Sequence, residues 1–202
     1  MKSRGLLVTL VVIGALAVFA IGIGLWVTGV YNFLVTLDEA VTSTWSNVET
    51  QYQRRADLVP NLVATVKGFA AQEREVLEAV TEARARVGQL NVTKDVLEDP
   101  EAFAKFQAAQ DGFSSALSRL LVVTENYPQL KSNENFLALQ DQLEGTENRI
   151  SIVRRQFNEV VQSYNTEIRR FPGSVVASFG GFSERQYFSG TPGTEKAPEV
   201  KF

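Results

Sequence analysis

The sequence predicts an all-α protein: an N-terminal transmembrane helix, then an antiparallel up-and-down four-helix bundle, then a short irregular C-terminal tail. Three observations predict this fold. Residues 5–37 carry no charged side chain, which exceeds the roughly 20 apolar residues that a membrane-spanning helix needs. Four later segments repeat apolar residues at steps of three and four. Clusters that contain proline or glycine separate these segments.

The anchor is the first element, and its most apolar part runs from Leu6 to Thr28. A cleaved secretory signal is the alternative, because a basic start precedes it and Ala15-Leu16-Ala17 or Val18-Phe19-Ala20 could serve as a cleavage site. The apolar run continues past both sites, whereas the apolar part of a signal is usually about 7–15 residues. We therefore favour an uncleaved anchor.

The charges on the two sides of the anchor predict its orientation. Lys2 and Arg4 precede it, whereas residues 30–53 contain Asp38, Glu39 and Glu49 but no Lys or Arg. The positive-inside bias keeps the short N-terminus in the cytoplasm and sends the bundle outward. The chain has no cysteine, which excludes disulfides, thiolate metal sites and a lipidated cysteine anchor.

The four bundle helices follow in order, separated by breaks at residues 54–60, 88–100 and 126–128 and ended by a break at 171–173. Pro60 favours a chain reversal, although a kinked continuous helix stays possible. Short loops between seams of similar length predict antiparallel neighbours. The expected core positions, helix by helix, are Val41, Trp45, Val48, Tyr52, Arg55 and Val59; Leu62, Val66, Phe69, Glu73, Val76, Val80, Ala83 and Val87; Phe103, Phe106, Gln110, Phe113, Leu117, Leu120, Thr124 and Tyr127; and Phe136, Leu139, Leu143, Thr146, Ile150, Val153, Phe157, Val160 and Tyr164.

A reversal at Pro60 would bring two loops together at the end of the bundle far from the membrane. Capping and turn chemistry explain the polar residues of these loops. A partner-binding surface is the alternative, because Arg and Tyr are favoured at interfaces. The candidate residues of this tip are Arg54, Arg55, Asp57, Asn61, Asn126, Tyr127, Asn133 and Asn135.

Arg55 and Glu73 place charges at core positions, and buried charges need partners. Counting back from a tip at Pro60 places Glu73 level with Thr146, within reach of Arg149. We expect Glu73, Thr146 and Arg149 to form a polar layer that fixes helix register. A small-ligand or ion site inside the bundle is the alternative.

The segment after Pro172-Gly173 is apolar and glycine-rich but too short to span a membrane again. It is expected to lie on the lipid surface or to fold back onto the base of the bundle, through Val175, Val176, Phe179 and Phe182. Residues 191–202 indicate a loose tail. The expected organisation is thus an anchor over residues 1–30, a bundle over 31–172 and a C-terminal segment over 173–202.

The composition argues against most catalytic chemistry. The chain has no histidine, the commonest general base and metal ligand, and Gly180-Gly181 is too short for a phosphate-binding loop. We therefore expect no enzymatic activity, no catalytic residue, no metal and no cofactor. A net charge of −3 argues against a nucleic-acid partner.

The chain resembles the LemA family of bacterial membrane proteins over about residues 30 to 202. The matching stretches are Tyr31-Asn32, Leu34-Val35, Trp45-Ser46, Arg54-Arg55-Ala56-Asp57-Leu58-Val59-Pro60-Asn61-Leu62-Val63, Glu125-Asn126-Tyr127-Pro128, Gly145-Thr146-Glu147-Asn148-Arg149-Ile150, Tyr164-Asn165 and Arg170-Phe171-Pro172. The resemblance implies an N-terminal anchor and a four-helix bundle, and it implies no catalytic residues.

These observations together favour a non-enzymatic membrane-anchored scaffold or interaction protein of the bacterial cell envelope. It would be a single-pass protein of the inner membrane, with its bundle on the outer or periplasmic side. We expect it to contact lipid through the N-terminal helix and to assemble with itself or with other envelope proteins. The alternative is a lipid-surface module that organises or remodels the membrane.

Overall fold

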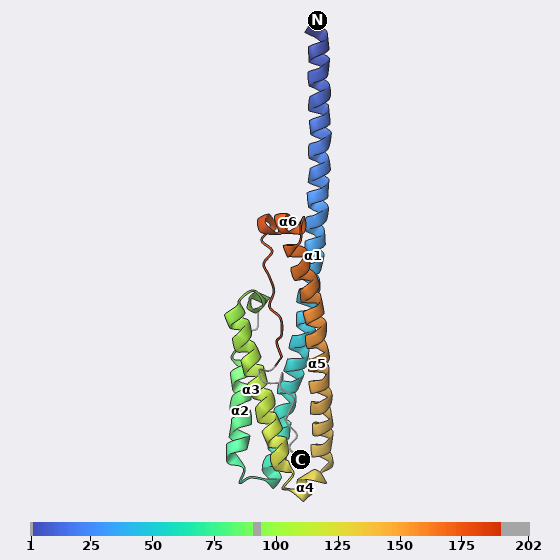
Figure 1. Cartoon of the computed structure of the whole chain (residues 1–202). Helices are drawn as coiled ribbons and strands as arrows, with labels where there is room; N and C mark the ends of the chain where they lie inside the picture. The colour runs from blue at the N-terminus through green and yellow to red at the C-terminus, as the bar shows by residue number, and fades with distance from the viewer. Residues whose placement is uncertain (1, 91–93, 191–202) are drawn as a thin grey trace, which may run out of the picture.

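The computed structural model describes residues 2–90 and 94–190, and all of its regular structure there is helical. The elements are α1 (Lys2–Phe69), α2 (Arg74–Gly88), the short 3-10 helix η1 (Lys94–Leu97), α3 (Pro100–Thr124), α4 (Pro128–Lys131), α5 (Glu134–Arg169) and α6 (Gly173–Gly180). Figure 1 shows a long N-terminal helix that enters a bundle formed with α2, α3 and α5. The predicted all-α fold, with an apolar N-terminal helix and packed helices, is confirmed.

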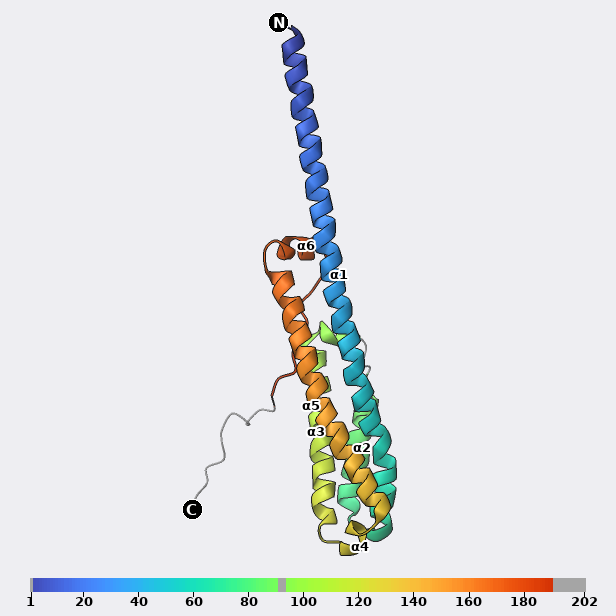
Figure 2. The ribbon, with the colours of Figure 1, turned by 90° about the vertical axis from the view of Figure 1, so that its right-hand side faces the viewer.

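The N-terminal helix α1 continues without interruption for 68 residues, from the uncharged run into the bundle. Within the described residues it is the one helix that is long and apolar enough to cross a membrane. Side chains from Thr9 to Gly29 are exposed, and packing against the bundle begins at Val30. Anchor and bundle therefore share one helix, without a linker between them (Figure 2).

The expected chain reversal at Pro60 is wrong. Pro60 lies inside α1, and the chain reverses at residues 70–73 instead. A proline inside a helix removes the amide donor for the carbonyl four residues earlier, here that of Ala56. Arg84 of α2 supplies the missing donor, since its Nε lies 2.9 Å from the Ala56 oxygen. This contact satisfies the freed carbonyl, so α1 can continue past the proline.

The bundle is uneven in length because α2 has 15 residues and α3 has 25, whereas α5 has 36. The α2–α3 hairpin covers the part of α1 far from its uncharged run, and α5 returns along α1 almost to that run (Figure 1). The predicted second helix, residues 62–87, is therefore divided between the end of α1 and α2. At the far end, α4 places the fully buried Leu130 under the core.

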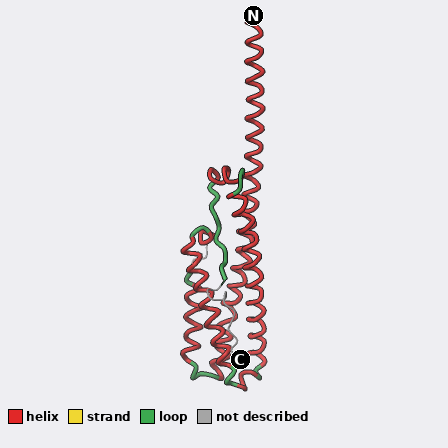
Figure 3. Tube along the Cα trace, in the orientation of Figure 1, coloured by secondary structure: helices red, strands yellow, loops and turns green. Residues whose placement is uncertain are grey.

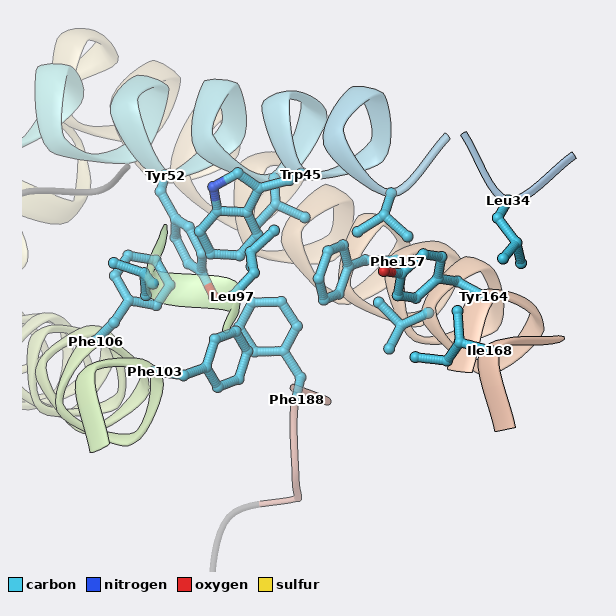
Figure 4. Packing of buried hydrophobic residues seen from close by; sticks show 14 of the residues in the cluster. Leu34, Trp45, Tyr52, Leu97, Phe103, Phe106, Phe157, Tyr164, Ile168 and Phe188 are labelled. Carbon is cyan, nitrogen blue, oxygen red and sulfur yellow. The ribbon is translucent and has the colours of Figure 1, made fainter. Parts of the chain in front are cut away.

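The core consists of two apolar clusters that follow each other along the bundle. The membrane-side cluster, which is the one nearer the uncharged run of α1, is rich in aromatic rings, and Phe103, Phe106 and Phe157 each pack against Trp45 (Figure 4). The distal cluster contains mainly aliphatic side chains around Phe113 and Phe136. Because the two apolar clusters are separate, polar side chains occupy the level of the bundle between them.

The chain after α5 is more ordered than the irregular tail that the sequence predicts. Residues 173–180 form α6, which lies crosswise to α1 at the membrane-side end of the bundle (Figures 1 and 2). Gly181 then adopts a left-handed conformation, with φ of 76°. Residues 182–190 return as a loop along the bundle (Figure 3). The loose tail expected for residues 191–202 lies outside the described residues.

Candidate functional site

A polar layer around Arg55 separates the two core clusters. The Arg55 side chain is 1% exposed and lies over the rings of Tyr52 and Phe113, with its Cζ atom 5.1 and 5.0 Å from the ring centroids. Arg55 of α1 thus lies between Tyr52 of the membrane-side cluster and Phe113 of the distal cluster. Such contacts between a guanidinium and aromatic faces are attractive.

The Arg55 guanidinium also connects α1 to both α3 and α5. Its Nη1 donates to Ser114 Oγ at 2.6 Å and to Glu147 Oε1 at 2.9 Å, and its Nη2 donates to Gln110 Oε1. The Gln110 side chain is buried, whereas the Glu147 side chain is 38% exposed. The expectation that a buried charge at position 55 has a partner is confirmed.

The polar layer predicted from Glu73, Thr146 and Arg149 is wrong in two of its three members. Glu73 lies in the turn after α1, where its Oε1 accepts a hydrogen bond from Tyr127 Oη at 2.7 Å. Arg149 is exposed. Thr146 is fully buried beside the observed layer and donates to the Gln142 carbonyl. The error follows from the wrongly predicted turn at Pro60. Because the chain turns at residues 70–73 instead, Glu73 lies at the tip and not in the middle of the bundle.

The observed layer has the character of a structural contact between helices, and the alternative of a small-ligand or ion site inside the bundle stays a prediction. Each polar partner of Arg55 is engaged by its guanidinium. Over residues 2–90 and 94–190, the structure brings together no group of three or more His, Cys, Asp or Glu side chains that could hold a metal ion. The arrangement fits a role in fixing helix register, which is the best-attested use of buried ionic groups.

The candidate tip is divided by the continuous α1. Arg54, Arg55, Asp57 and Asn61 lie along this helix and not at the tip, which corrects the prediction for these four residues. These four residues lie within α1 because the helix continues past Pro60. Arg54 and Asp57 line an open cleft of about 900 Å³ between α1 and the α2–α3 hairpin, together with Glu49. Burial raises the pKa of the Glu49 carboxyl.

The other four candidate residues do lie at the tip. Asn133 caps α5 by accepting a hydrogen bond from the Phe136 amide at 3.0 Å. The hydrogen bond to the Glu73 carboxylate raises the pKa of Tyr127. Asn126 and Asn135 are exposed. Local hydrogen bonds therefore account for Asn133 and Tyr127, and the partner-binding role of the exposed Asn126 and Asn135 stays a prediction.

The apolar segment folds back onto the base of the bundle, which is one of its two expected arrangements, whereas the other, contact with the lipid surface, stays a prediction. Val176 of α6 is buried against the bundle, and the Phe182 ring packs edge-on to Tyr31 of α1 with centroids 5.5 Å apart. Val175 and Phe179 point away from the bundle and are 48% and 90% exposed. The segment thus folds back onto the base of the bundle and also presents apolar side chains outward, at the level where α1 leaves its uncharged run.

Two residues anchor the C-terminal segment; sequence reasoning missed Arg185, and it considered Phe188 only as an extension of the apolar contact that begins at Val175. Arg185 makes a salt bridge to Asp38 at 2.8 Å and a second one to Glu98. Phe188 is 6% exposed and inserts into the aromatic cluster beside Trp45 and Phe103 (Figure 4). The weak signal that could have located the binding place of this segment is the pair Asn158 and Asn165, which lie two helical turns apart on one face of α5.

Comparisons with known proteins show what this chain is similar to. The model of the LemA family matches residues 44–202. The magnetosome protein MamQ 2 of Paramagnetospirillum magneticum is 29% identical over 206 residues, which cover 94% of this chain and 75% of that protein. The magnetosome protein MamQ of Magnetospirillum gryphiswaldense is also 29% identical, over 80% of this chain and 65% of that protein. Protein LemA of Metamycoplasma hominis is 23% identical, over 79% of this chain and 69% of that protein.

Proposed function

We propose that this chain, which belongs to the LemA family, is a non-enzymatic membrane-anchored scaffold of the bacterial cell envelope that assembles with itself or with other envelope proteins. The observation that carries the proposal is the continuity of α1 from the span into both core clusters. A scaffold needs its binding surfaces at fixed positions, and an unbroken helix supplies them. At roughly 1.5 Å per residue, α1 holds the tip about 60 Å from the level of Tyr31.

The Arg55 layer supports the same reading. Its hydrogen bonds connect α1 to α3 and α5, so the rest of the bundle is fixed relative to the helix that crosses the membrane. The absence of histidine, the commonest general base, argues against catalysis. The scaffold would lie in the inner membrane with its bundle outside, on the basis of the positive-inside bias. Because some of its relatives are magnetosome proteins, we propose membrane organisation as the process that the scaffold serves.

Crosslinking of the full chain in native membranes before extraction tests the scaffold. Lys67, Lys105 and Lys131 are exposed on the bundle, so an amine-reactive crosslinker has targets there. A ladder of defined oligomers, or defined complexes with other envelope proteins, would support the proposal. A chain that stays monomeric and uncrosslinked with crosslinkers of every length would contradict it. Insertion of Gly-Ser-Gly-Ser after Gly29, just before packing against the bundle begins, is the informative variant. It uncouples the bundle from the anchor and should replace the defined oligomers by a diffuse range of crosslinked products.

A second candidate function has a specific observation in its favour. The exposed Phe179 and Val175 of α6 lie at the level of Tyr31, where the span ends, so α6 fits a helix resting on the bilayer surface. Amphipathic helices of this kind bind lipid in proportion to the apolar area that they bury. On this reading the protein organises the membrane directly. A measurement of lipid depth at position 179 distinguishes this function from the scaffold.

A further inference from the structure

The C-terminal segment lies in a groove whose walls recognise its main chain. Residues 185–189 are extended between α3 and α5, and most of the segment is exposed on its outer side (Figure 3). At two positions the side-chain amide of an asparagine pairs with both the N–H and the C=O of one residue. Asn165 Oδ1 accepts from the Arg185 amide at 2.9 Å, and its Nδ2 donates to the Arg185 carbonyl at 2.8 Å.

Asn158 repeats this pairing at Phe188. Its Oδ1 accepts from the Phe188 amide and its Nδ2 donates to the Phe188 carbonyl, each at 2.9 Å. From the opposite wall, Gln107 of α3 donates to the Ser189 carbonyl at 2.8 Å and accepts from the Ser189 amide at 3.3 Å. Main-chain donors and acceptors are the same in every residue. The groove therefore recognises an extended peptide as such at three positions.

The spacing of the two asparagines matches the repeat of an extended chain. Asn158 and Asn165 are seven residues apart in α5, which is about 10.5 Å along the helix. Arg185 and Phe188 are three residues apart, which is about 10 Å in an extended chain. The two repeats coincide, so a helix with amides at this interval pairs with an extended peptide at every third residue.

Two side-chain pockets add sequence preference to the main-chain contacts. Arg185 lies between the carboxylates of Asp38 and Glu98, with its Cζ atom 5.5 Å from the centroid of the Tyr164 ring. Phe188 lies within 5.0 to 6.0 Å, centroid to centroid, of the rings of the aromatic cluster. The groove thus selects an extended segment with Arg and Phe three residues apart.

We infer that this groove is a peptide-binding site that also accepts residues 185–189 of a second copy of this chain. The inference deepens the proposed function and rests on it, because it names the contact through which the scaffold would join its copies. The same contacts could form if the segment came from another molecule. Exchange of an identical segment between protomers is a low-cost route to assembly, since the same contacts are made in either case.

The geometry of an anchored protein favours this exchange. Two copies in one membrane have parallel anchors, so the segment of a neighbour enters the groove from the same end and in the same direction. The linker from Gly181 to Glu184 reaches about 14 Å when extended. The exchange therefore requires two copies that face each other through their groove sides at about this separation. Gly181 supplies the backbone freedom for redirecting the linker, since its positive φ shows a conformation that other residues avoid.

A photo-crosslinking amino acid at Tyr187 tests the exchange in the full chain. Tyr187 is 43% exposed, adjoins the anchoring Phe188 and makes none of the main-chain pairs. Cells would co-express one chain with the probe and a second, differently tagged chain without it. We expect a crosslinked product that carries both tags. Asn158→Ala with Asn165→Ala in the probe-free chain should reduce this product at least tenfold, because a tenfold change requires only about 1.4 kcal/mol and four hydrogen bonds are removed.

Matched controls separate the possible outcomes. Asn148→Ala in the probe-free chain changes an exposed asparagine of the same helix and should leave the two-tag product unchanged. A synthetic peptide of residues 182–190 should suppress the product, and the same peptide with Arg185→Ala and Phe188→Ala should not. Crosslinks confined to single chains, alongside an intact amine-crosslinked ladder, would overturn the exchange while sparing the scaffold. Loss of the ladder as well would overturn both.

Discussion

Replacing Arg55 by methionine should destabilise the bundle far more than the same change at Arg54. The two arginines are adjacent in α1, yet the Arg55 side chain is 1% exposed and that of Arg54 lies in solvent. Methionine keeps much of the length and the apolar contacts of Arg55 but removes its donors. Gln110 is 3% exposed and would lose the guanidinium donor on its Oε1.

The expected size of the effect follows from these partners. Breaking a buried ion pair by removing one partner typically costs about 3–5 kcal/mol, and a buried acceptor left unsatisfied accounts for about 1–3 kcal/mol of such a loss. The Glu147 side chain is 38% exposed, so its carboxylate can regain water. We therefore expect the lower end, a loss of about 3 kcal/mol in the free energy of unfolding. The double variant Arg55→Met with Gln110→Leu should recover most of this loss, because it removes the acceptor together with the donor.

Guanidinium unfolding of the full chain in detergent micelles measures the effect. The fluorescence of Trp45 reports bundle unfolding because this residue is buried in the aromatic cluster, whereas Trp26 lies in the span. Arg54→Met is the matched control and should stay within about 0.5 kcal/mol of the unchanged chain, as surface substitutions usually do. Equal stabilities for the Arg55→Met and Arg54→Met variants would refute the assignment of Arg55 as the central residue of the core layer.

Three further predictions use the same chain. Arg84→Met should lower the free energy of unfolding by about 1 kcal/mol, the usual net value of one hydrogen bond. Pro60→Ala in the same chain should restore this loss because alanine returns the missing amide donor. Equal losses with and without Pro60→Ala would contradict this prediction. Burial raises the pKa of Tyr164 to about 12, whereas an unfolded tyrosine titrates near 10, so stability should fall as the pH rises from about 10 to 12, and Tyr164→Phe should flatten that fall in pH-dependent unfolding curves. The chain has no cysteine, so a fluorophore on Phe179→Cys should be quenched by brominated lipid while one on the exposed Val122→Cys should not, and equal quenching would argue against a lipid-facing α6.

The helices and their buried faces were predictable from the sequence because periodicity reports burial directly. Phe113, Ile150 and Phe157 occupy predicted core positions and are buried. The N-terminal anchor was predictable for the same kind of reason, since a long uncharged run has few other uses. The position of the first turn was not predictable in this way. Proline weakens a helix locally, but whether it ends the helix depends on a donor from elsewhere in the chain, here Arg84.

The C-terminal groove was beyond sequence reasoning for a different physical reason. Its walls recognise backbone, so the bound segment carries little pattern except Arg185 and Phe188. An aromatic residue in a segment rich in serine and glycine resembles many exposed tails. The pairing becomes visible only when α5 is known to extend along α1 to the membrane, because this places Asn158 and Asn165 beside the returning chain.

The polar layer shows how far one misplaced turn propagates, and how much follows once it is placed. A turn at residues 70–73 leaves Arg55 about 15 residues before the tip. Gln110 likewise lies about 15 residues before the turn that follows α3, and Glu147 lies about 14 residues after Asn133 caps α5. At roughly 1.5 Å per residue all three reach the same height, about 22 Å from the tip. The partners of Arg55 are thus determined by loop positions and not by any local signal. A register fixed in this way explains why a costly buried charge is useful here, because a slip of one helical turn would leave Arg55 without its partners.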